Sequence, residues 1–306
     1  MTATTTTTAL HTDGLGKQYG RRWALQGSTF DVPAGRVVAL VGPNGAGKTT
    51  LLHLAAGLLR PTAGAITVFG GDPARDLDLL PRIGLVAQDM PLYKGLTVRD
   101  TLRLGEKLNP RWDNAMAVDR LHQLGIDLDQ KVGTLSGGQR AQVALAVALG
   151  KRPELLLLDE PLASLDPLAR REFMQTLMLT AAEGDLTIML SSHLIADLER
   201  VCDHLVLVAA GRTQLAADID ALLATHRVLI GPRTTGPIPG VAEIIDETAT
   251  GRQASMIVRV DGPIHDPRWT TEEVALEELV LAYLSQAQGA ANDTRLHALD
   301  LMGAAS

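Results

Sequence analysis

The sequence predicts an α/β fold: a core with a mostly parallel sheet, antiparallel strands near the N-terminus, a helical insertion and a small C-terminal α+β domain. Apolar segments at 37–41, 155–158, 186–190 and 205–208 have the composition of strands buried on both faces of a sheet. The segments between the successive core strands are long enough to contain crossover helices, which parallel pairing requires. At 306 residues, the length is typical of about two domains.

The N-terminal part of the core is predicted to contain several short strands. Residues 1–9 are rich in threonine and lack the basic start and apolar core of a signal peptide, so we expect a disordered tail. Residues 15–32 alternate loosely between apolar and polar types, which favours short antiparallel strands. Further strands are expected at 65–69, between glycine turns, and at 82–87.

The composition changes after Gln88. Helical segments at 98–107 and 114–124 are separated by Asn109-Pro110 and followed by Gly125. We therefore expect a helical subdomain at about 89–150 inside a core that extends over residues 10–212.

The C-terminal part has a different pattern. Two strand-like segments flank a turn at Thr250-Gly251, which predicts a hairpin. A helix is predicted from Trp269 to Gln286, because Thr270 and Glu273 have the spacing of a capping box. Residues 213–289 are thus expected to form a small accessory domain, and 290–306 a flexible tail.

Composition excludes several classes of function. The net charge of −7 provides no basic field that would attract nucleic acid, and aromatic residues make up only 3% of the chain. No apolar segment approaches the roughly 18 residues of a membrane-spanning helix. The single cysteine, Cys202, rules out an internal disulfide and favours a reducing compartment.

A glycine-rich segment between the first buried strand and the next helix carries the clearest chemical signal. Its glycines let backbone N–H groups converge on phosphate oxygens, and the helix adds the positive end of its dipole. Lys48 is expected to reach the β- and γ-phosphates of a nucleotide, and the Thr49 hydroxyl to bind Mg²⁺. The alternative is a turn that only joins strand to helix. The predicted loop comprises Gly42, Pro43, Asn44, Gly45, Ala46, Gly47, Lys48, Thr49 and Thr50.

Two acids follow the apolar strand at 155–158, at the end where parallel α/β sheets bind their ligands. Asp159 is expected to hold Mg²⁺ through its water shell, and Glu160 to position and polarise the attacking water. Alternatively, both acids cap the next segment.

A helix is predicted to begin after Leu135 with Ser136, Gly137, Gly138 and Gln139. Unpaired N–H groups at this helix start, together with the serine hydroxyl, form a possible second anion-binding surface. An ordinary helix cap has the same pattern, so residue types alone leave the two interpretations open.

The ordered set of motifs resembles the ATP-binding subunit of an ABC transporter. The resemblance covers about residues 10–212. It depends on the phosphate loop, Gln88 after a strand, residues 135–139, the acidic strand, Ser164-Leu165-Asp166, and His193 after Ser191-Ser192. The single cassette and the short C-terminal appendix resemble drug, antibiotic and other exporter subunits more than importers with a long regulatory domain.

The resemblance implies roles for individual residues. Tyr19 would stack on adenine, and Gln88 would contact Mg²⁺ and the attacking water. His193 would contact the γ-phosphate, and Asp166 would couple two sites across a dimer. In such a dimer, a homodimer or a heterodimer of cassettes, Ser136 and Gly138 of one chain would close over ATP held by Lys48 of the other.

The sequence departs from the family pattern at two places. Arg140 is followed by Ala141 and Gln142, where a second basic residue is usual, and residues 161–163 are more apolar than is common. Neither departure touches a group assigned to the chemistry.

The favoured function is an ATPase subunit that powers a separate transmembrane permease, expected to be an exporter, and that sits at the inner face of the cell membrane. The alternative is a soluble ATPase of the same type acting on ribosomes or nucleic acid, although such proteins usually carry two cassettes or a long coiled coil. A regulator that binds nucleotide without turnover is disfavoured by the presence of both Glu160 and His193.

Overall fold

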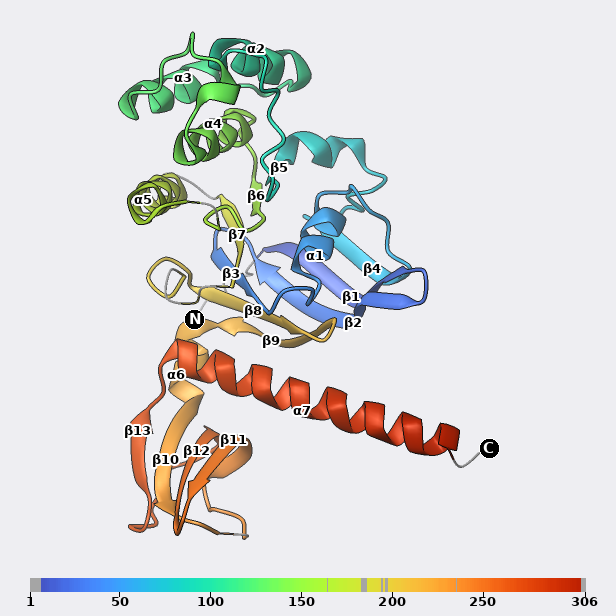
Figure 1. The fold of residues 1–306 in the computed structure, drawn as a ribbon, viewed down its shortest axis with the longest axis vertical. Helices are drawn as coiled ribbons and strands as arrows, with labels where there is room; N and C mark the ends of the chain where they lie inside the picture. The colour runs from blue at the N-terminus through green and yellow to red at the C-terminus, as the bar shows by residue number, and fades with distance from the viewer. Residues whose placement is uncertain are drawn as a thin grey trace.

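The computed structural model describes residues 7–303 except 164, 183–185, 194, 196, 197 and 235, with side chains described up to residue 289. Figure 1 shows the helical insertion at one end of the molecule, the central sheets in the middle and the C-terminal domain at the other end. Within the described residues, no helix is both long and apolar enough to cross a bilayer.

A mostly parallel sheet forms the centre of the molecule, with strands in the order β5-β6-β7-β3-β8-β9. The strands β5, β6, β7, β3 and β8 pair in parallel, and β9 pairs antiparallel with β8 at the edge of the sheet. Strands β3 and β6 occupy the predicted segments 37–41 and 155–158. The bounds are Val37–Val41 (β3), Ile83–Val86 (β5), Leu155–Leu158 (β6), Thr187–Ser192 (β7), His204–Ala209 (β8) and Arg212–Asp218 (β9).

An antiparallel sheet, β2-β1-β4, packs against one side of the parallel sheet together with helix α1. Leu51, Leu52 and Leu54 of α1 are fully buried in this core. The packing fixes α1 directly after β3 and thereby positions the intervening loop. The bounds are Thr8–Tyr19 (β1), Arg22–Pro33 (β2), Ala63–Val68 (β4) and Lys48–Ala55 (α1).

The helical insertion has a small apolar core of its own, which includes Leu102, Leu121 and Val143. Thr97 and Asp113 cap its first two α-helices by accepting backbone N–H groups, as their residue types favour. The helices between β4 and β6 in the sequence are Leu77–Arg82 (3₁₀ helix η1), Val98–Leu108 (α2), Asn114–Gln123 (α3), Val132–Thr134 (3₁₀ helix η2) and Gly137–Gly150 (α4).

Helices α4 and α5 (Pro167–Ala182) pack on the other face of the parallel sheet. Phe173 of α5 is fully buried there. Cys202 belongs to the same core, and burial, followed by the neighbouring charge of Asp203, raises the pKa of its thiol to about 12. The cysteine therefore behaves as a small buried apolar residue.

The C-terminal domain is built on an antiparallel sheet in the order β11-β12-β10-β13. The predicted hairpin is present as β11 and β12. However, β9 keeps the chain in the central sheet up to Asp218, so the accessory part begins later than the expected boundary after Arg212. Its elements are Ile219–Thr225 (α6), His226–Pro232 (β10), Val241–Thr250 (β11), Gln253–Val260 (β12), Thr270–Glu273 (β13) and Leu276–Gly303 (α7).

The predicted helix from Trp269 to Gln286 is wrong at its start. Residues Thr270–Glu273 are extended and pair with β10, so no capping box forms, and the helix begins at Leu276. Pairing with β10 outweighs the local capping signal, and the buried Trp269 ring packs against Gly231 of β10. The backbone of α7 also remains helical to Gly303, within the stretch 290–306 that was expected to be a loose tail.

Candidate functional site

The loop between β3 and α1 has the geometry of an anion cradle. Gly45 and Gly47 have φ angles of 78° and 113°, which side-chain-bearing residues rarely adopt. A Cβ atom on Gly47 would lie 2.5 Å from the Ala24 carbonyl oxygen, and one on Gly42 would lie 2.1 Å from that of Val208. The N-cap residue of α1 is Gly47, which has no side chain to cap the helix, so the first N–H groups remain available to a phosphate.

Lys48 lies at the start of α1 and is buried, with 6% of its surface exposed. Its Nζ donates a hydrogen bond to the Gly42 carbonyl oxygen at 2.7 Å and lies 3.1 Å from Glu160 Oε1. The ammonium group therefore connects the phosphate loop with the acid at the end of β6.

The two acids after β6 are held in place by β7, the next strand of the sheet. The Ser191 hydroxyl donates to Asp159 Oδ1 at 2.9 Å and accepts the Glu160 backbone N–H at 2.8 Å. Asp159 is almost completely buried, at 1% exposure. Glu160 has a left-handed backbone, with φ at 46°, which turns the chain immediately after the strand.

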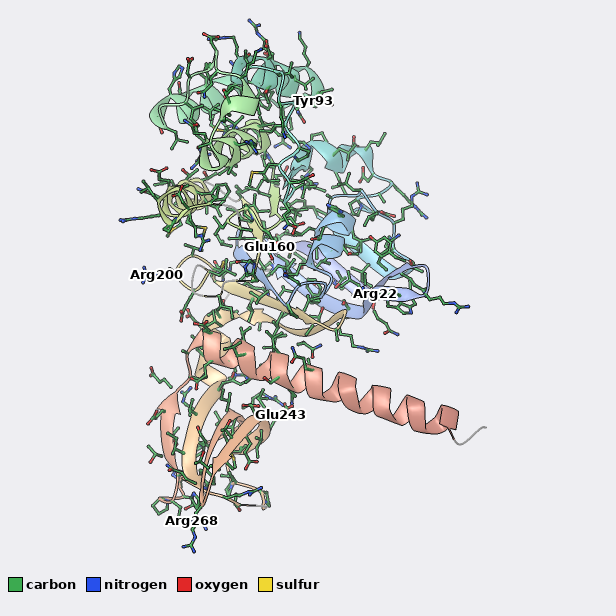
Figure 2. All side chains as sticks on the ribbon, viewed as in Figure 1. Arg22, Tyr93, Glu160, Arg200, Glu243 and Arg268 are labelled. Carbon is green, nitrogen blue, oxygen red and sulfur yellow. The ribbon has the colours of Figure 1, made fainter. Side chains whose placement is uncertain are left out.

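His193 contacts the Glu160 carboxylate at the oxygen that Lys48 does not contact. Its Nδ1 lies 2.8 Å from Glu160 Oε2, and because a carboxylate accepts, Nδ1 carries the proton and donates. The Glu160 carboxylate thus has a different cationic or donor group at each oxygen. Figure 2 labels Glu160 between the central strands and α1.

A cavity of about 580 Å³ brings these groups together. It includes most of the predicted nucleotide-binding residues, but Gly42, Pro43 and Asp159 do not line it. Arg22, Ala24 and Ala163 line it although they were not predicted as site residues. The full lining is Tyr19, Arg22, Ala24, Asn44, Gly45, Ala46, Gly47, Lys48, Thr49, Thr50, Gln88, Glu160, Ala163 and His193.

The predicted second anion-binding surface lies outside this cavity. Ser136 caps α4 in a capping box: its hydroxyl accepts Gln139 N–H at 3.1 Å, and Gln139 Oε1 accepts Ser136 N–H at 3.0 Å. Ser136 and Gly137 are exposed. Asp166 accepts the N–H groups of Leu168 and Ala169 at 3.0 Å and is also exposed. Within one chain, these residues act as helix caps.

Ser164 of the Ser164-Leu165-Asp166 motif lies outside the described residues. The predicted Mg²⁺ ligands supply hydroxyl, amide and carboxylate oxygens, which suit this ion, and Thr49 and Gln88 line the cavity. Among the described residues, no group of three or more His, Cys, Asp or Glu could form a metal site.

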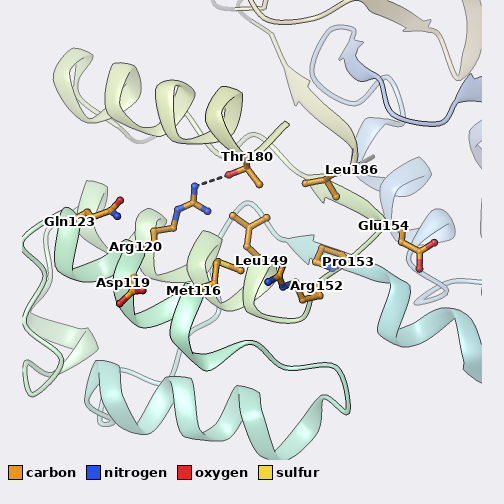
Figure 3. Close-up of a pocket in the computed structure, with 10 residues that line it drawn as sticks. All are labelled: Met116, Asp119, Arg120, Gln123, Leu149, Arg152, Pro153, Glu154, Thr180 and Leu186. Carbon is orange, nitrogen blue, oxygen red and sulfur yellow. Dashed lines mark hydrogen bonds between the residues drawn. The ribbon is translucent and has the colours of Figure 1, made fainter. Parts of the chain in front are cut away.

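A second cavity, of about 430 Å³, lies between α3, the end of α4 and α5 (Figure 3). Its Arg120 donates to Thr180 Oγ1 at 2.7 Å and to the Thr176 carbonyl at 3.2 Å. Glu154, at its rim, pairs with Arg82 and Arg111. These contacts tie the helical insertion to α5 and to the start of β6, so we assign the cavity a structural role at this junction.

Comparison with known proteins places the chain in a family. A family model described as "ABC transporter" matches residues 25–163. The thiamine import ATP-binding protein ThiQ of Escherichia coli O157:H7 is 39% identical over 191 residues, covering 60% of this chain and 82% of ThiQ. The sulfate/thiosulfate import ATP-binding protein CysA of Yersinia pestis is 35% identical over 215 residues, covering 67% of this chain and 59% of CysA.

Solved structures agree with the sequence relatives. The dimeric structure of MJ0796, a bacterial ABC transporter cassette, aligns with a TM-score of 0.62 and 25% identity, covering 69% of this chain and 98% of that one. The fold is that of an ATP-binding cassette. The chain belongs to the ABC transporter family of ATP-binding proteins, which are ATPases. The matched region spans only about three fifths of CysA.

Proposed function

We propose that this protein binds and hydrolyses ATP as the cassette subunit of an ABC transporter and drives a separate transmembrane permease. The observation that carries the proposal is the Glu160 carboxylate, which lies between Lys48 and His193 in the same cavity as the phosphate loop. An acid at this place can activate water beside a bound triphosphate.

The residues divide into three roles. The loop amides and Lys48 bind the phosphates, while Tyr19 stacks on the base. Thr49, Gln88 and, through water, Asp159 hold Mg²⁺, which neutralises phosphate charge when bound. Glu160 positions and polarises the attacking water, and His193 orients that carboxylate and contacts the terminal phosphate. The buried Ser191 hydroxyl bonds to both acids and so fixes their positions relative to each other.

We propose that the complete site forms between two cassettes, in a homodimer or a heterodimer. Ser136 and Gly137 are exposed at a helix start and lie outside the cavity of their own chain, so they are accessible to a second chain. Asp166 is likewise exposed at the start of α5. Closing these groups over ATP makes association depend on the bound nucleotide.

An apolar groove of about 360 Å³ beside the helical insertion supports a permease partner. Met90, Pro91 and Leu92 line it, and the exposed Leu58 and Leu80 lie at its edge. Exposed large apolar residues around one groove are typical of an interaction surface. We propose that the permease binds here and thereby places the protein at the cytoplasmic face of the membrane.

The expected export direction gains no support from the two sequence relatives described above, because ThiQ and CysA are both named as import proteins. We therefore limit the proposal to the ATPase role. We further propose that residues up to Asp218 form the cassette, with its helical subdomain at about 89–150, and that the following sheet and α7 form an accessory domain.

Two substitutions test the proposal. Lys48→Ala should weaken ATP binding severely, because a buried cation at the phosphate loop is lost. Glu160→Gln should keep ATP binding, lower the hydrolysis rate by about a hundredfold or more and accumulate as an ATP-bound dimer. ATP titration, phosphate release and light scattering measure these effects, with Glu277→Gln, an exposed acid on α7, as the matched control. Hydrolysis by Glu160→Gln at the unmutated rate would refute the role of this acid.

A further inference from the structure

Arg22 lies beside the predicted base-stacking residue at the tip of the β1–β2 hairpin. The two-residue turn Gly20-Arg21 connects the strands, and Gly20 has a φ angle of 58°. Tyr19 and Arg22 are directly opposite each other in the register. Because opposite residues of an antiparallel pair share a face, both side chains project on the same side, and both line the nucleotide cavity.

The Arg22 guanidinium extends over the phosphate loop. Its Nη2 lies 3.7 Å from the position that a Cβ atom on Gly45 would occupy. Gly45 lines the same cavity, and it has no side chain that would separate its backbone from the guanidinium. The guanidinium therefore lies close to the phosphate loop, on the face of the hairpin that Arg22 shares with Tyr19.

Arg22 forms no hydrogen bond or ion pair with any of the described residues. Other arginines of the chain, such as Arg36, Arg82 and Arg152, pair with carboxylates. A solvated arginine at a hairpin tip needs no partner, but Arg22 differs from an ordinary surface arginine because it borders an anion-binding loop. Arg21, its neighbour in the turn, is exposed and does not line the cavity.

We propose that Arg22 binds the phosphates shared by ATP and ADP and so contributes to nucleotide affinity without taking part in bond cleavage. The inference rests on the proposed ATP site. A planar guanidinium can donate two parallel hydrogen bonds to one phosphate, an interaction that an ammonium cannot reproduce. Because the contact is the same before and after hydrolysis, it stabilises the ground state and the transition state equally.

Nucleotide titrations of Arg22→Ala, Arg22→Lys and the control Arg21→Ala test this proposal. We expect Arg22→Ala to raise Kd for ATP and ADP by about tenfold each, and KM by a similar factor, with kcat within about twofold of wild type. Arg22→Lys should recover part of the affinity, and Arg21→Ala should match wild type. The loss should be as large for GTP as for ATP, because the base is not contacted.

Several results would overturn the inference. Unchanged affinity in Arg22→Ala would show a solvated side chain, and a loss confined to ATP would indicate contact with the transferred phosphate only. A loss that differs between ATP and GTP would indicate contact with the base. A failure of the proposed function itself is distinguishable, because then wild type would not bind ATP or Lys48→Ala would bind it equally well.

Discussion

At the scale of single residues, Glu160 combines an unfavourable backbone with favourable side-chain contacts. Its left-handed φ of 46° costs on the order of 1 kcal/mol or more for a residue with a side chain. Lys48 and His193 at its carboxylate, and the Ser191 hydroxyl at its backbone N–H, offset this cost. The turn directs the Glu160 carboxylate into the cavity. A continued strand would direct it elsewhere.

Ser191 provides a direct test of this arrangement. Ser191→Ala removes the donor to Asp159 and leaves the buried Glu160 N–H without its acceptor, so we expect a loss of about 1–3 kcal/mol in the free energy of unfolding. ATP hydrolysis should fall more than ATP binding. Ser28→Ala is the control, because the buried Ser28 hydroxyl has no hydrogen-bond partner among the described residues. Urea unfolding and steady-state kinetics measure both effects; equal stability of the two variants would contradict the expectation.

The sequence was informative at this scale only where the signal is local. The phosphate loop and the acidic pair are each continuous in sequence, and both occur where predicted, at the ends of β3 and β6. Ser191 and Arg22 could not be assigned in this way. Ser191 reaches Asp159 because β7 pairs with β6, and Arg22 reaches the loop through the hairpin. Such contacts follow from strand pairing and not from spacing.

At the scale of elements, the helical insertion contains an aromatic side chain enclosed by glycines. Cβ atoms on Gly105 of α2 and Gly150 of α4 would lie 2.5 and 2.7 Å from the Trp112 ring. Glycine within a helix costs roughly 1 kcal/mol relative to alanine. The close approach of Trp112 explains why position 105, in the interior of α2, is a glycine.

Gly105→Ala should therefore destabilise the protein despite the better helix propensity of alanine. We expect a loss of about 1–3 kcal/mol, because the rigid ring cannot move aside without shifting a helix. Gly95→Ala is the control, since a Cβ atom there meets no other heavy atom within 4 Å. Thermal or urea unfolding compares the variants. A stabilised Gly105→Ala protein would mean that propensity outweighs packing at this position.

The predicted helix starts are correct in the insertion and wrong at Trp269, and packing explains the difference. Helices α2 and α3 start at the predicted residues, because caps and apolar spacing agree with their packing. At 270–273 the local signal for a helix start competes with a free edge of β10, and strand pairing prevails. The elements β9, α6 and β10 were not predicted, although Asp218 caps α6 by accepting the Ala221 N–H and a turn at Ala210-Gly211 precedes β9.

At the scale of the whole molecule, α7 connects the accessory domain with the cassette. The helix contacts both β11 and β8, and its Leu279 and Val280 belong to the core that continues under the central sheet. Figure 1 shows that α7 begins between the central parallel sheet and the C-terminal sheet. A buried polar contact fixes it: His226 Nδ1 donates to the Leu222 carbonyl at 2.8 Å, and His226 Nε2 lies 2.9 Å from the Tyr283 hydroxyl.

These distances fit a neutral histidine, in which Nδ1–H donates to the Leu222 carbonyl and Nε2 accepts a hydrogen bond from the Tyr283 hydroxyl. Burial lowers the pKa of His226, while the Leu222 carbonyl opposes that shift. The charged groups nearby are Arg259, which also lowers the pKa, and Glu243, which raises it and pairs with Arg259 at 3.1 Å.

The stability of the protein should therefore depend on pH in a defined direction. A histidine with a folded pKa below its unfolded value of about 6.5 binds more protons when unfolded, so the free energy of unfolding is fully retained above pH 6.5 and falls as the pH drops below it. His226→Gln keeps a donor and an acceptor but does not titrate, and it should reduce this loss. His204, whose pKa burial also lowers, accounts for part of the remainder.

Urea unfolding midpoints between pH 5 and pH 8 measure the effect, with the exposed His265→Gln as the matched control. Tyr283→Phe adds a second comparison: it should cost about 1 kcal/mol at pH 8, where the hydroxyl donates a hydrogen bond to the neutral imidazole of His226. An equally steep pH dependence in wild type and His226→Gln would show that other groups govern the acid sensitivity. A reduced dependence in His226→Gln but not in His265→Gln would locate the sensitivity at the junction that holds α7 against both parts of the protein.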